Sequence, residues 1–295
     1  MKNRLFYGLC TALVTPFLDG KVNYPMLDIL IRRQIQAGVK AIVLCGTTGE
    51  SATLSDEEKL EIFRRGVRAA NGECKIIAGT GSNHTRHAVE LSQQAEKCGV
   101  DGLLVVTPYY NKATPAGLIA HFRAVSESVQ IPIILYNVPS RTGVDIPLQV
   151  CRALSEIPNI AGIKEAGTDI VKIARIIAEC GLNLPVYSGN DDQTTAVMAL
   201  GGRGVISVAS NVAPIEMNAM VTAAQNGDYD LAGLMQRKLL PLTDLMFCQV
   251  NPIPVKAAMK YIGFDCGSCR LPLDDLTPEN QEKMEAFFRE RKDLS

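Results

Sequence analysis

The chain has 295 residues, and its 47% of hydrophobic and 21% of charged residues are typical of a soluble globular protein with one large domain. Its formal net charge of -1 leaves no basic excess with which to bind phosphates or an anionic membrane, so we expect neither nucleic acid nor a membrane as a partner. An acidic substrate must therefore be held by cations that are placed within a site.

Eight short runs of β-branched and apolar residues recur over the first two thirds of the chain. Runs of this length and composition, bounded by turn residues, predict strands. The predicted strands cover residues 10–14, 41–45, 75–79, 102–106, 131–136, 161–164, 185–187 and 204–208.

Segments with helical periodicity lie between most of these strands. An apolar stripe begins after Asn23 and ends at Gly38, a residue type that commonly terminates helices. After Ser55, Glu58 completes a capping box, which marks the start of a second helix. A third stripe closes at Gly99.

Strands that alternate with helices indicate βαβ units, and eight such units favour a closed barrel over an open doubly wound sheet. After the eighth strand the pattern changes to consecutive helices, with breaks near Gly227 and Asn251-Pro252. We therefore predict an α/β protein in which residues 1–225 form a (β/α)8 TIM barrel that carries the active site. Residues 226–295 would form a C-terminal helical extension packed on the barrel.

Active sites of such barrels lie where the strands end at their C-terminal edge. Hydroxyl groups, one lysine and one arginine follow five of the predicted strands, without a histidine, thiol or carboxylate cluster of metal-ligand spacing. We therefore expect chemistry that needs no metal and no cofactor. The segments are 46–51, 107–111, 136–143, 163–166 and 187–191.

Lys164 is the candidate nucleophile. The two-residue period of a strand places Gly162 and Ala166 on its face, and these small neighbours leave room for a ligand beside the amine. Burial in a barrel disfavours the charged amine, and a neutral amine can attack a ketone to form an imine. From this segment alone, a lysine that reaches solvent or pairs with Glu165 is the more common arrangement.

Tyr136 ends the preceding predicted strand on the same face as Ile134. If that face points inward, the phenol lies within reach of the imine carbon, where imine formation and aldol addition both need a group that shuttles protons. A core tyrosine with a satisfied hydroxyl is an equally good interpretation until other motifs are considered.

The remaining polar loops are less specific. Residues 46–50 could cradle a phosphate, form a simple turn or, as the paired threonines favour, bind a small carboxylate. Arg141 could bind a carboxylate through its guanidinium fork, although a lone loop arginine is usually a surface charge. Asp191 and Asp192 are better explained as the start of a helix than as a catalytic acid pair.

Nine cysteines are scattered mostly within apolar runs, which is typical of reduced thiols in a cytoplasmic protein rather than of a disulfide framework. Cys266 and Cys269 are the one close pair. Without a second pair or a nearby histidine, two thiols in a loop are favoured over a zinc or redox site. No apolar run approaches the roughly 18 residues of a membrane helix, and we expect a cytoplasmic protein.

Taken together, these segments resemble the dihydrodipicolinate synthase / N-acetylneuraminate lyase family of pyruvate-dependent class I (Schiff-base) aldolases. The resemblance covers nearly the whole chain, from Ala-Leu-Val-Thr-Pro-Phe at 12–17 to Leu-Pro-Leu at 271–273. The combination of Gly-Thr-Thr-Gly-Glu, Tyr-Asn-Val-Pro-Ser-Arg-Thr and Ile-Lys-Glu-Ala is highly specific.

The resemblance implies that Lys164 forms the Schiff base with pyruvate and that Tyr136 is the central proton donor and acceptor. Thr47 and Tyr110 would complete a hydroxyl relay with Tyr136 toward solvent, and Thr48 would bind the pyruvate carboxylate. In the family the tyrosine that matches Tyr110 comes from a neighbouring subunit, which implies at least a dimer and usually a homotetramer.

The resemblance also implies that Arg141 holds the carboxylate of a second substrate, L-aspartate 4-semialdehyde, while the backbones of Gly189 and Ile206 line the site. Sialic acid lyases typically lack this arginine, and a sugar calls for neutral hydrogen-bonding groups instead. The implied reaction is the condensation to 4-hydroxy-tetrahydrodipicolinate in diaminopimelate and lysine biosynthesis. The alternatives are another pyruvate aldolase, such as N-acetylneuraminate lyase or a 2-keto-3-deoxy-sugar acid aldolase, and a non-catalytic keto-acid-binding relative.

Lysine-inhibited members of the family keep a set of polar residues at a subunit interface. The corresponding positions here are Ser51, Ala52, Lys59, Asn83, His87 and Tyr109. His87 stands where sensitive members have a glutamate, and Lys59 where they have a histidine. With two fewer acceptors for an ammonium group, we expect weak or absent inhibition by lysine.

Overall fold

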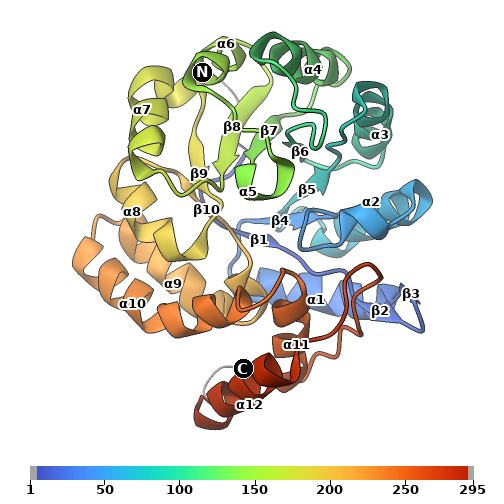
Figure 1. Ribbon diagram of the computed structural model, residues 1–295, viewed down its shortest axis with the longest axis vertical. Coiled ribbons are helices and arrows are strands. Elements are labelled where there is room, and N and C mark those ends of the chain that lie inside the picture. The colour runs from blue at the N-terminus through green and yellow to red at the C-terminus, as the bar shows by residue number, and fades with distance from the viewer. Residues whose placement is uncertain (1–4, 292–295) are drawn as a thin grey trace.

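The protein is described by a computed structural model that covers residues 5–291 (Figure 1). Eight parallel strands form a closed barrel in the order β1-β10-β9-β8-β7-β6-β5-β4, which confirms the predicted TIM barrel. The strands are β1 (Gly8–Ala12), β4 (Ala41–Leu44), β5 (Lys75–Gly79), β6 (Gly102–Val106), β7 (Ile133–Asn137), β8 (Ile160–Glu165), β9 (Val186–Ser188) and β10 (Gly204–Ser207).

The first strand begins and ends two residues before its predicted position at 10–14. Leu13 and Val14 are buried like strand residues, so the apolar run continues beyond the strand itself. The Val14 amide donates to Asn211 Oδ1 at 3.1 Å instead of to a neighbouring strand. A short antiparallel pair that was not predicted, β2 (Phe17–Leu18) and β3 (Lys21–Val22), follows outside the barrel.

Helices surround the barrel, and two of the predicted starts have the expected caps. Asn23 Oδ1 accepts from the Met26 amide at 3.2 Å, and Ser55 and Glu58 form the reciprocal capping box. The helices are α1 (Tyr24–Gln36), α2 (Asp56–Ala70), α3 (Thr85–Lys97), α4 (Pro115–Glu127), α5 (Pro139–Thr142), α6 (Leu148–Ser155), α7 (Ile170–Cys180), α8 (Thr194–Ala199) and α9 (Pro214–Gln225), with 3-10 turns η1 (Ser51–Thr53), η2 (Gly181–Asn183), η3 (Asp191–Gln193) and η4 (Ala209–Asn211).

Up to residue 291, three helices follow the barrel: α10 (Tyr229–Met246), α11 (Ile253–Tyr261) and α12 (Pro278–Glu290). α10 packs against α8 and α9, and the chain then returns past β2 and β3, where the Phe17 amide donates to the Cys266 carbonyl at 2.8 Å (Figure 1). The division of the chain after residue 225 stays a prediction, and residues 1–4 and 292–295 of the two predicted ranges lie outside the described residues.

The apolar core has two layers. One lies between the strands and the surrounding helices, and the other fills the inside of the barrel. At the N-terminal end of the strands, Phe6 stacks on Tyr187 with ring centroids 4.3 Å apart, and the Tyr187 hydroxyl donates to the Phe6 carbonyl at 2.7 Å. The barrel is thus filled at that end, which leaves its C-terminal end for a site. Within residues 5–291, no helix is long and apolar enough to cross a membrane.

Candidate active site

Lys164 and Tyr136 lie side by side inside the barrel. They are paired residues in the register of β8 and β7, and both are buried, with 5% and 6% of their surface exposed. The Lys164 Nζ lies 4.5 Å from the centroid of the Tyr136 ring. Strand alternation thus places an amine and a phenol next to each other, as the sequence pattern predicts.

The Lys164 amine makes no hydrogen bond and no ion pair with any described residue from 5 to 291. The alternative partner that the sequence offers, Glu165, points to the opposite face of β8. Its carboxylate there accepts from Asn137 Nδ2 at 2.9 Å and pairs with Lys172 at 3.3 Å. Lys164 is therefore held by packing within the barrel and not by an ion pair, and its charge partly offsets the rise that burial causes in the pKa of the Asp191 carboxyl.

The outward partners of the two strands form a saturated network. Asn137 and Glu165 are again paired in register, and Asp145 accepts from both Asn137 and Lys172. Burial raises the pKa of the Glu165 carboxyl, although the charge of Lys172 opposes this shift. This network fixes the ends of β7 and β8 from outside, and so it fixes the positions of Tyr136 and Lys164 inside.

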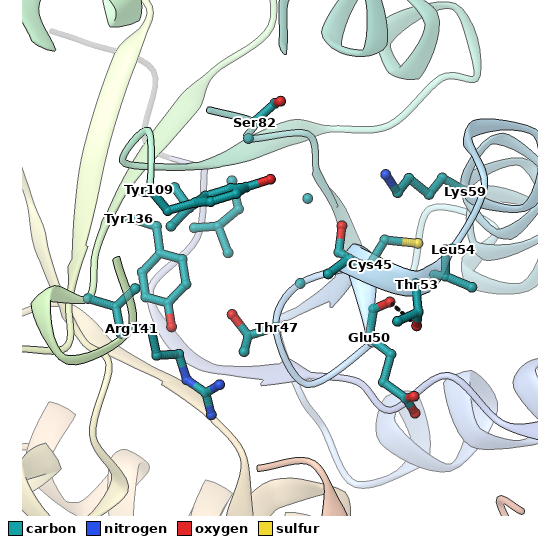
Figure 2. Close-up of a pocket in the computed structure, with 18 of the residues that line it drawn as sticks. Cys45, Thr47, Glu50, Thr53, Leu54, Lys59, Ser82, Tyr109, Tyr136 and Arg141 are labelled. Carbon is teal, nitrogen blue, oxygen red and sulfur yellow. Dashed lines mark hydrogen bonds between the residues drawn. The ribbon is translucent and has the colours of Figure 1, made fainter. Parts of the chain in front are cut away.

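The threonine loop follows β4 and is shaped by two residues with left-handed backbone, Cys45 (φ 53°) and Glu50 (φ 55°). Thr48 is buried and its hydroxyl accepts from Asn251 Nδ2 at 3.0 Å. Thr47 is half-buried, and Figure 2 shows its hydroxyl facing that of Tyr136 across the pocket.

A cavity of about 630 Å³ lies beside Thr47 and Tyr136. Thr47, Tyr136 and Arg141 contribute to its lining, and the Arg141 guanidinium points toward the same region as the two hydroxyls (Figure 2). Arg141 lies in the short helix α5, not in a loop as the sequence suggests, and it donates to the Asn251 carbonyl at 3.0 Å, which holds the guanidinium at the cavity. At this end of the cavity the Arg141 cation and several hydroxyls therefore face a space large enough for a small diacid.

Two further residues, Ile206 and Gly189, were predicted to line the site. Ile206 belongs to the interior apolar cluster that contains Tyr136, and it is fully buried. Gly189 follows β9, and its amide donates to the Glu165 carbonyl at 2.7 Å. A Cβ on Gly189 would meet the Ala166 side chain at 2.5 Å, so a side chain there would crowd the lysine's neighbour.

Tyr110 does not join the other hydroxyls within this chain. Its side chain is 88% exposed, and its backbone has a φ of 72°, which is rare for a residue other than glycine. Its neighbour Tyr109 instead lines the cavity and points across it toward Lys59 (Figure 2). The relay predicted for Thr47, Tyr136 and Tyr110 is thus incomplete in one chain.

The far end of the cavity contains most of the predicted regulatory residues. Ser51, Ala52, Lys59, His87 and Tyr109 line it. The Asn83 carbonyl accepts from Asn111 Nδ2 at 2.8 Å close by.

Asp56, which the sequence analysis did not single out, lies between the two substituted positions of this set. Its carboxylate accepts from His87 Nε2 at 2.7 Å and pairs with Lys59 at 3.4 Å. Burial alone would raise the pKa of Asp56, but the hydrogen bond from His87 and the charge of Lys59 hold it below its usual value. This carboxylate is therefore already engaged by two side chains of the same chain.

Two further residues near the site were not predicted to act there. Asp191 begins η3, as expected, but its carboxylate is buried and accepts from the amides of Val208 and Ala209 at 2.9 Å. Asn251 was noted only as a break between helices, and it contacts both Thr48 and Arg141. The contacts of Asp191 and Asn251 join different elements of the fold, so local sequence patterns cannot show them.

The cysteine pair does not form a reactive centre. Burial raises the pKa of both Cys266 and Cys269 to about 12, which keeps these thiols protonated. Across the described part of the chain, no group of three or more histidine, cysteine, aspartate or glutamate side chains is arranged to hold a metal ion.

Comparison with known proteins gives consistent matches over nearly the full length. The model of the dihydrodipicolinate synthetase family matches residues 5–291. The 4-hydroxy-tetrahydrodipicolinate synthase of Acetivibrio thermocellus is 45% identical over 290 residues, which cover 98% of this chain and 99% of that enzyme.

Two solved structures show the same agreement in three dimensions. The crystal structure of dihydrodipicolinate synthase from Aquifex aeolicus is 43% identical, with a TM-score of 0.95 and coverage of 97% of this chain and 98% of that one. The crystal structure of dihydrodipicolinate synthase from Thermotoga maritima is 39% identical, with a TM-score of 0.96 and coverage of 99% and 100%.

Proposed function

This chain belongs to the dihydrodipicolinate synthetase family, and we propose that it performs its reaction through an imine between Lys164 and pyruvate. It is a lyase of the 4-hydroxy-tetrahydrodipicolinate synthase type, which condenses pyruvate with L-aspartate 4-semialdehyde in diaminopimelate and lysine biosynthesis. The observation that supports the role of Lys164 is its buried amine, 4.5 Å from the ring of Tyr136 and without a hydrogen bond or ion pair among residues 5–291.

In the first step, the Lys164 Nζ attacks the ketone carbon of pyruvate. Tyr136 donates a proton to the departing oxygen, which leaves as water, and an imine forms. Because Tyr136 must donate and accept protons in turn, it needs a second hydroxyl beside it. Thr47 faces Tyr136 across the pocket and is suited to pass these protons on (Figure 2).

In the second step, loss of a methyl proton converts the imine into an enamine. The enamine carbon attacks the aldehyde carbon of the semialdehyde, and the aldehyde oxygen takes up a proton. The amine of the semialdehyde portion then attacks the imine carbon, closes the ring and releases Lys164. The proton transfers of these steps are assigned to the Tyr136 hydroxyl.

The two carboxylates are assigned to different groups. The hydroxyl of Thr48, with the amide of Thr47, binds the carboxylate of pyruvate, while the Arg141 guanidinium binds that of the semialdehyde. Gly189 and Ile206 are assigned to the lining of the site through their backbones. A cation suits the second substrate because this substrate brings its own carboxylate, whereas a sugar would not need one.

We propose that the active enzyme is a homotetramer built from dimers, in which Tyr110 completes the relay of a neighbouring subunit. The 88% exposure of Tyr110 and its positive φ support this role, since the side chain is directed away from its own cavity. Light scattering should give a mass above that of one chain, and a fully active monomer would contradict the proposal. We place the enzyme in the cytoplasm, where both substrates would be formed.

For regulation we propose weak or absent inhibition by lysine. Lys59 and His87 already hold the Asp56 carboxylate, so the ammonium group of a lysine ligand would find no free anion among these three side chains. A steady-state titration with lysine should leave the rate nearly unchanged, and potent inhibition would refute this. The double variant Lys59→His, His87→Glu should gain sensitivity.

A coupled assay with the purified protein tests the reaction itself. We expect turnover of pyruvate with L-aspartate 4-semialdehyde, and little or no cleavage of N-acetylneuraminate or of 2-keto-3-deoxy-sugar acids. Preferred cleavage of a sugar acid would show that the second substrate is assigned wrongly. Binding of pyruvate without any turnover would favour the non-catalytic alternative.

A further inference from the structure

Asn251 connects the two side chains to which the substrate carboxylates are assigned. It lies just before α11, it is 5% exposed, and it reaches the cavity from the C-terminal part of the chain. Its side-chain Nδ2 donates to the Thr48 hydroxyl at 3.0 Å, and its main-chain carbonyl accepts from Arg141 at 3.0 Å. The residue thus contacts one group through its side chain and the other through its backbone.

We propose that Asn251 is a positioning residue that turns the Thr48 hydroxyl into a donor toward the pyruvate carboxylate. A hydroxyl has one proton to donate and two lone pairs that accept. Because Asn251 Nδ2 occupies a lone pair of Thr48, the Thr48 proton remains free to point at a ligand. A carboxylate can only accept, so it needs that proton. This inference rests on the proposed function, in particular on Thr48 as the group that binds pyruvate.

The side chain of Asn251 is not explained by stability alone. Its Oδ1 is buried and has no hydrogen-bond partner among the described residues 5–291, and a buried acceptor without a donor is unfavourable for folding. If the amide were reversed, Oδ1 would take the Thr48 proton and Nδ2 would lose its acceptor. Only the observed orientation leaves Thr48 able to donate to an anion.

The two links of Asn251 can be separated by mutation. Any side-chain substitution keeps the main-chain carbonyl that accepts from Arg141, so the semialdehyde site keeps its support. Asn251→Asp has nearly the same shape, but its carboxylate can only accept. It would take the Thr48 proton and place a negative charge beside the pyruvate carboxylate. Asn251→Ala would remove the contact without adding a competing acceptor.

The test measures the pyruvate concentration at which borohydride traps half of the protein, called here the pyruvate half-saturation. It also measures the KM of both substrates, in the wild type and in these variants. Asn251→Asp should raise the pyruvate half-saturation about tenfold or more, the size expected for a lost hydrogen bond to a charged group. Asn251→Ala should raise the pyruvate half-saturation less. In both variants the KM for the semialdehyde should change about twofold or less, because the change at residue 251 reaches Arg141 only through solvent-screened electrostatics.

A pH profile of the Asn251→Asp variant gives a second readout that a purely structural role would not produce. Once protonated, the introduced carboxyl can donate to Thr48 as the native amide does. The ratio of the variant to the wild-type half-saturation should therefore shrink as the pH is lowered from about 8 to about 5.5, toward the range in which carboxyl groups take up protons.

Asn218→Asp is the matched control, because Asn218 Nδ2 donates to the Ala37 carbonyl at 3.0 Å, outside the cavity lining. It should leave pyruvate half-saturation unchanged. Wild-type half-saturation in Asn251→Asp, or equal effects of Asn251→Asp and Asn251→Ala on both substrates, would overturn the inference. The variant Thr48→Val distinguishes failure of the proposed function from failure of this inference. If Thr48→Val captures pyruvate normally, the assigned role of Thr48 is wrong. If Thr48→Val loses capture and Asn251→Asp does not, only the role of Asn251 is wrong.

Discussion

Two lysines of this protein are almost equally buried but have different surroundings. Lys164 is 5% exposed and Lys256 is 4% exposed, and each amine lies over an aromatic ring, at 4.5 Å from Tyr136 and 4.2 Å from Phe17. Lys256 also pairs with Glu50 at 2.9 Å and donates to the Ser268 carbonyl at 3.1 Å. Lys164 has no such partner within residues 5–291.

The difference separates a structural lysine from a reactive one. A buried ammonium is tolerated when an anion and further acceptors surround it, and these same groups occupy its hydrogen atoms. A buried amine that lacks them costs stability but is free to act as a nucleophile. Lys256 accordingly joins the C-terminal segment to the threonine loop through Glu50, while Lys164 lies inside the barrel beside Tyr136, which lines the cavity.

Removal of the Lys164 amine should have the largest effect on activity. We expect Lys164→Ala to lose turnover by about 10³-fold or more, because no imine can form. Its melting temperature should stay equal to that of the wild type or rise, since an unpaired buried amine is removed. The coupled assay and thermal unfolding measure the two effects. Near-normal turnover would place the nucleophile elsewhere.

Replacement of Tyr136 by phenylalanine tests what the reactive lysine needs beside it. The apolar packing is kept while the hydroxyl is lost, so kcat should fall by about 10²- to 10⁴-fold, the usual contribution of a positioned acid or base. The far-ultraviolet circular dichroism spectrum should not change. If kcat falls less than about tenfold, the proton shuttle is another group.

Lys256→Met should affect folding more than chemistry. It leaves the Glu50 carboxylate buried without its cation, which costs about 3–5 kcal/mol of unfolding free energy by denaturant titration. The double variant Glu50→Gln, Lys256→Met should recover part of this loss. Protein that is still folded should capture pyruvate with borohydride at a normal level. Failure of capture in well-folded Lys256→Met would abolish the contrast between the two lysines.

Arg141→Ala should have the smallest and most selective effect. Loss of a charge-assisted contact should raise the KM for L-aspartate 4-semialdehyde by about 10- to 100-fold. Pyruvate capture by Lys164 should change about twofold or less, because the guanidinium is assigned to the other carboxylate. Equal damage to both substrates, measured by trapping and by steady-state kinetics, would mean that the two subsites are not separate.

Much of the barrel follows from local patterns. The eight apolar runs correspond to the eight strands, and alternation along two of them places Tyr136 and Lys164 on one inward face. The position of β1 could not be fixed from its apolar run, because the run and its burial extend past the end of the strand to Leu13 and Val14.

The supporting contacts of the site could not be predicted in the same way. Glu50 and Lys256 are 206 residues apart in sequence, and Asn251 and Thr48 are 203 apart, so no local period connects them. Tyr110 is 88% exposed and has a positive φ within a loop, and no sequence pattern predicts either feature. The contacts of Lys256 and Asn251 arise because the C-terminal segment returns to the barrel (Figure 1).

Borohydride reduction in the presence of pyruvate, followed by peptide mapping, tests the central claim most directly. If Lys164 is the reactive lysine and Lys256 the structural one, the reduced pyruvate adduct will be found on the peptide that contains Lys164 and not on the one that contains Lys256. An adduct on Lys256 or on any other lysine, or an unmodified Lys164 in folded and saturated protein, would contradict the account.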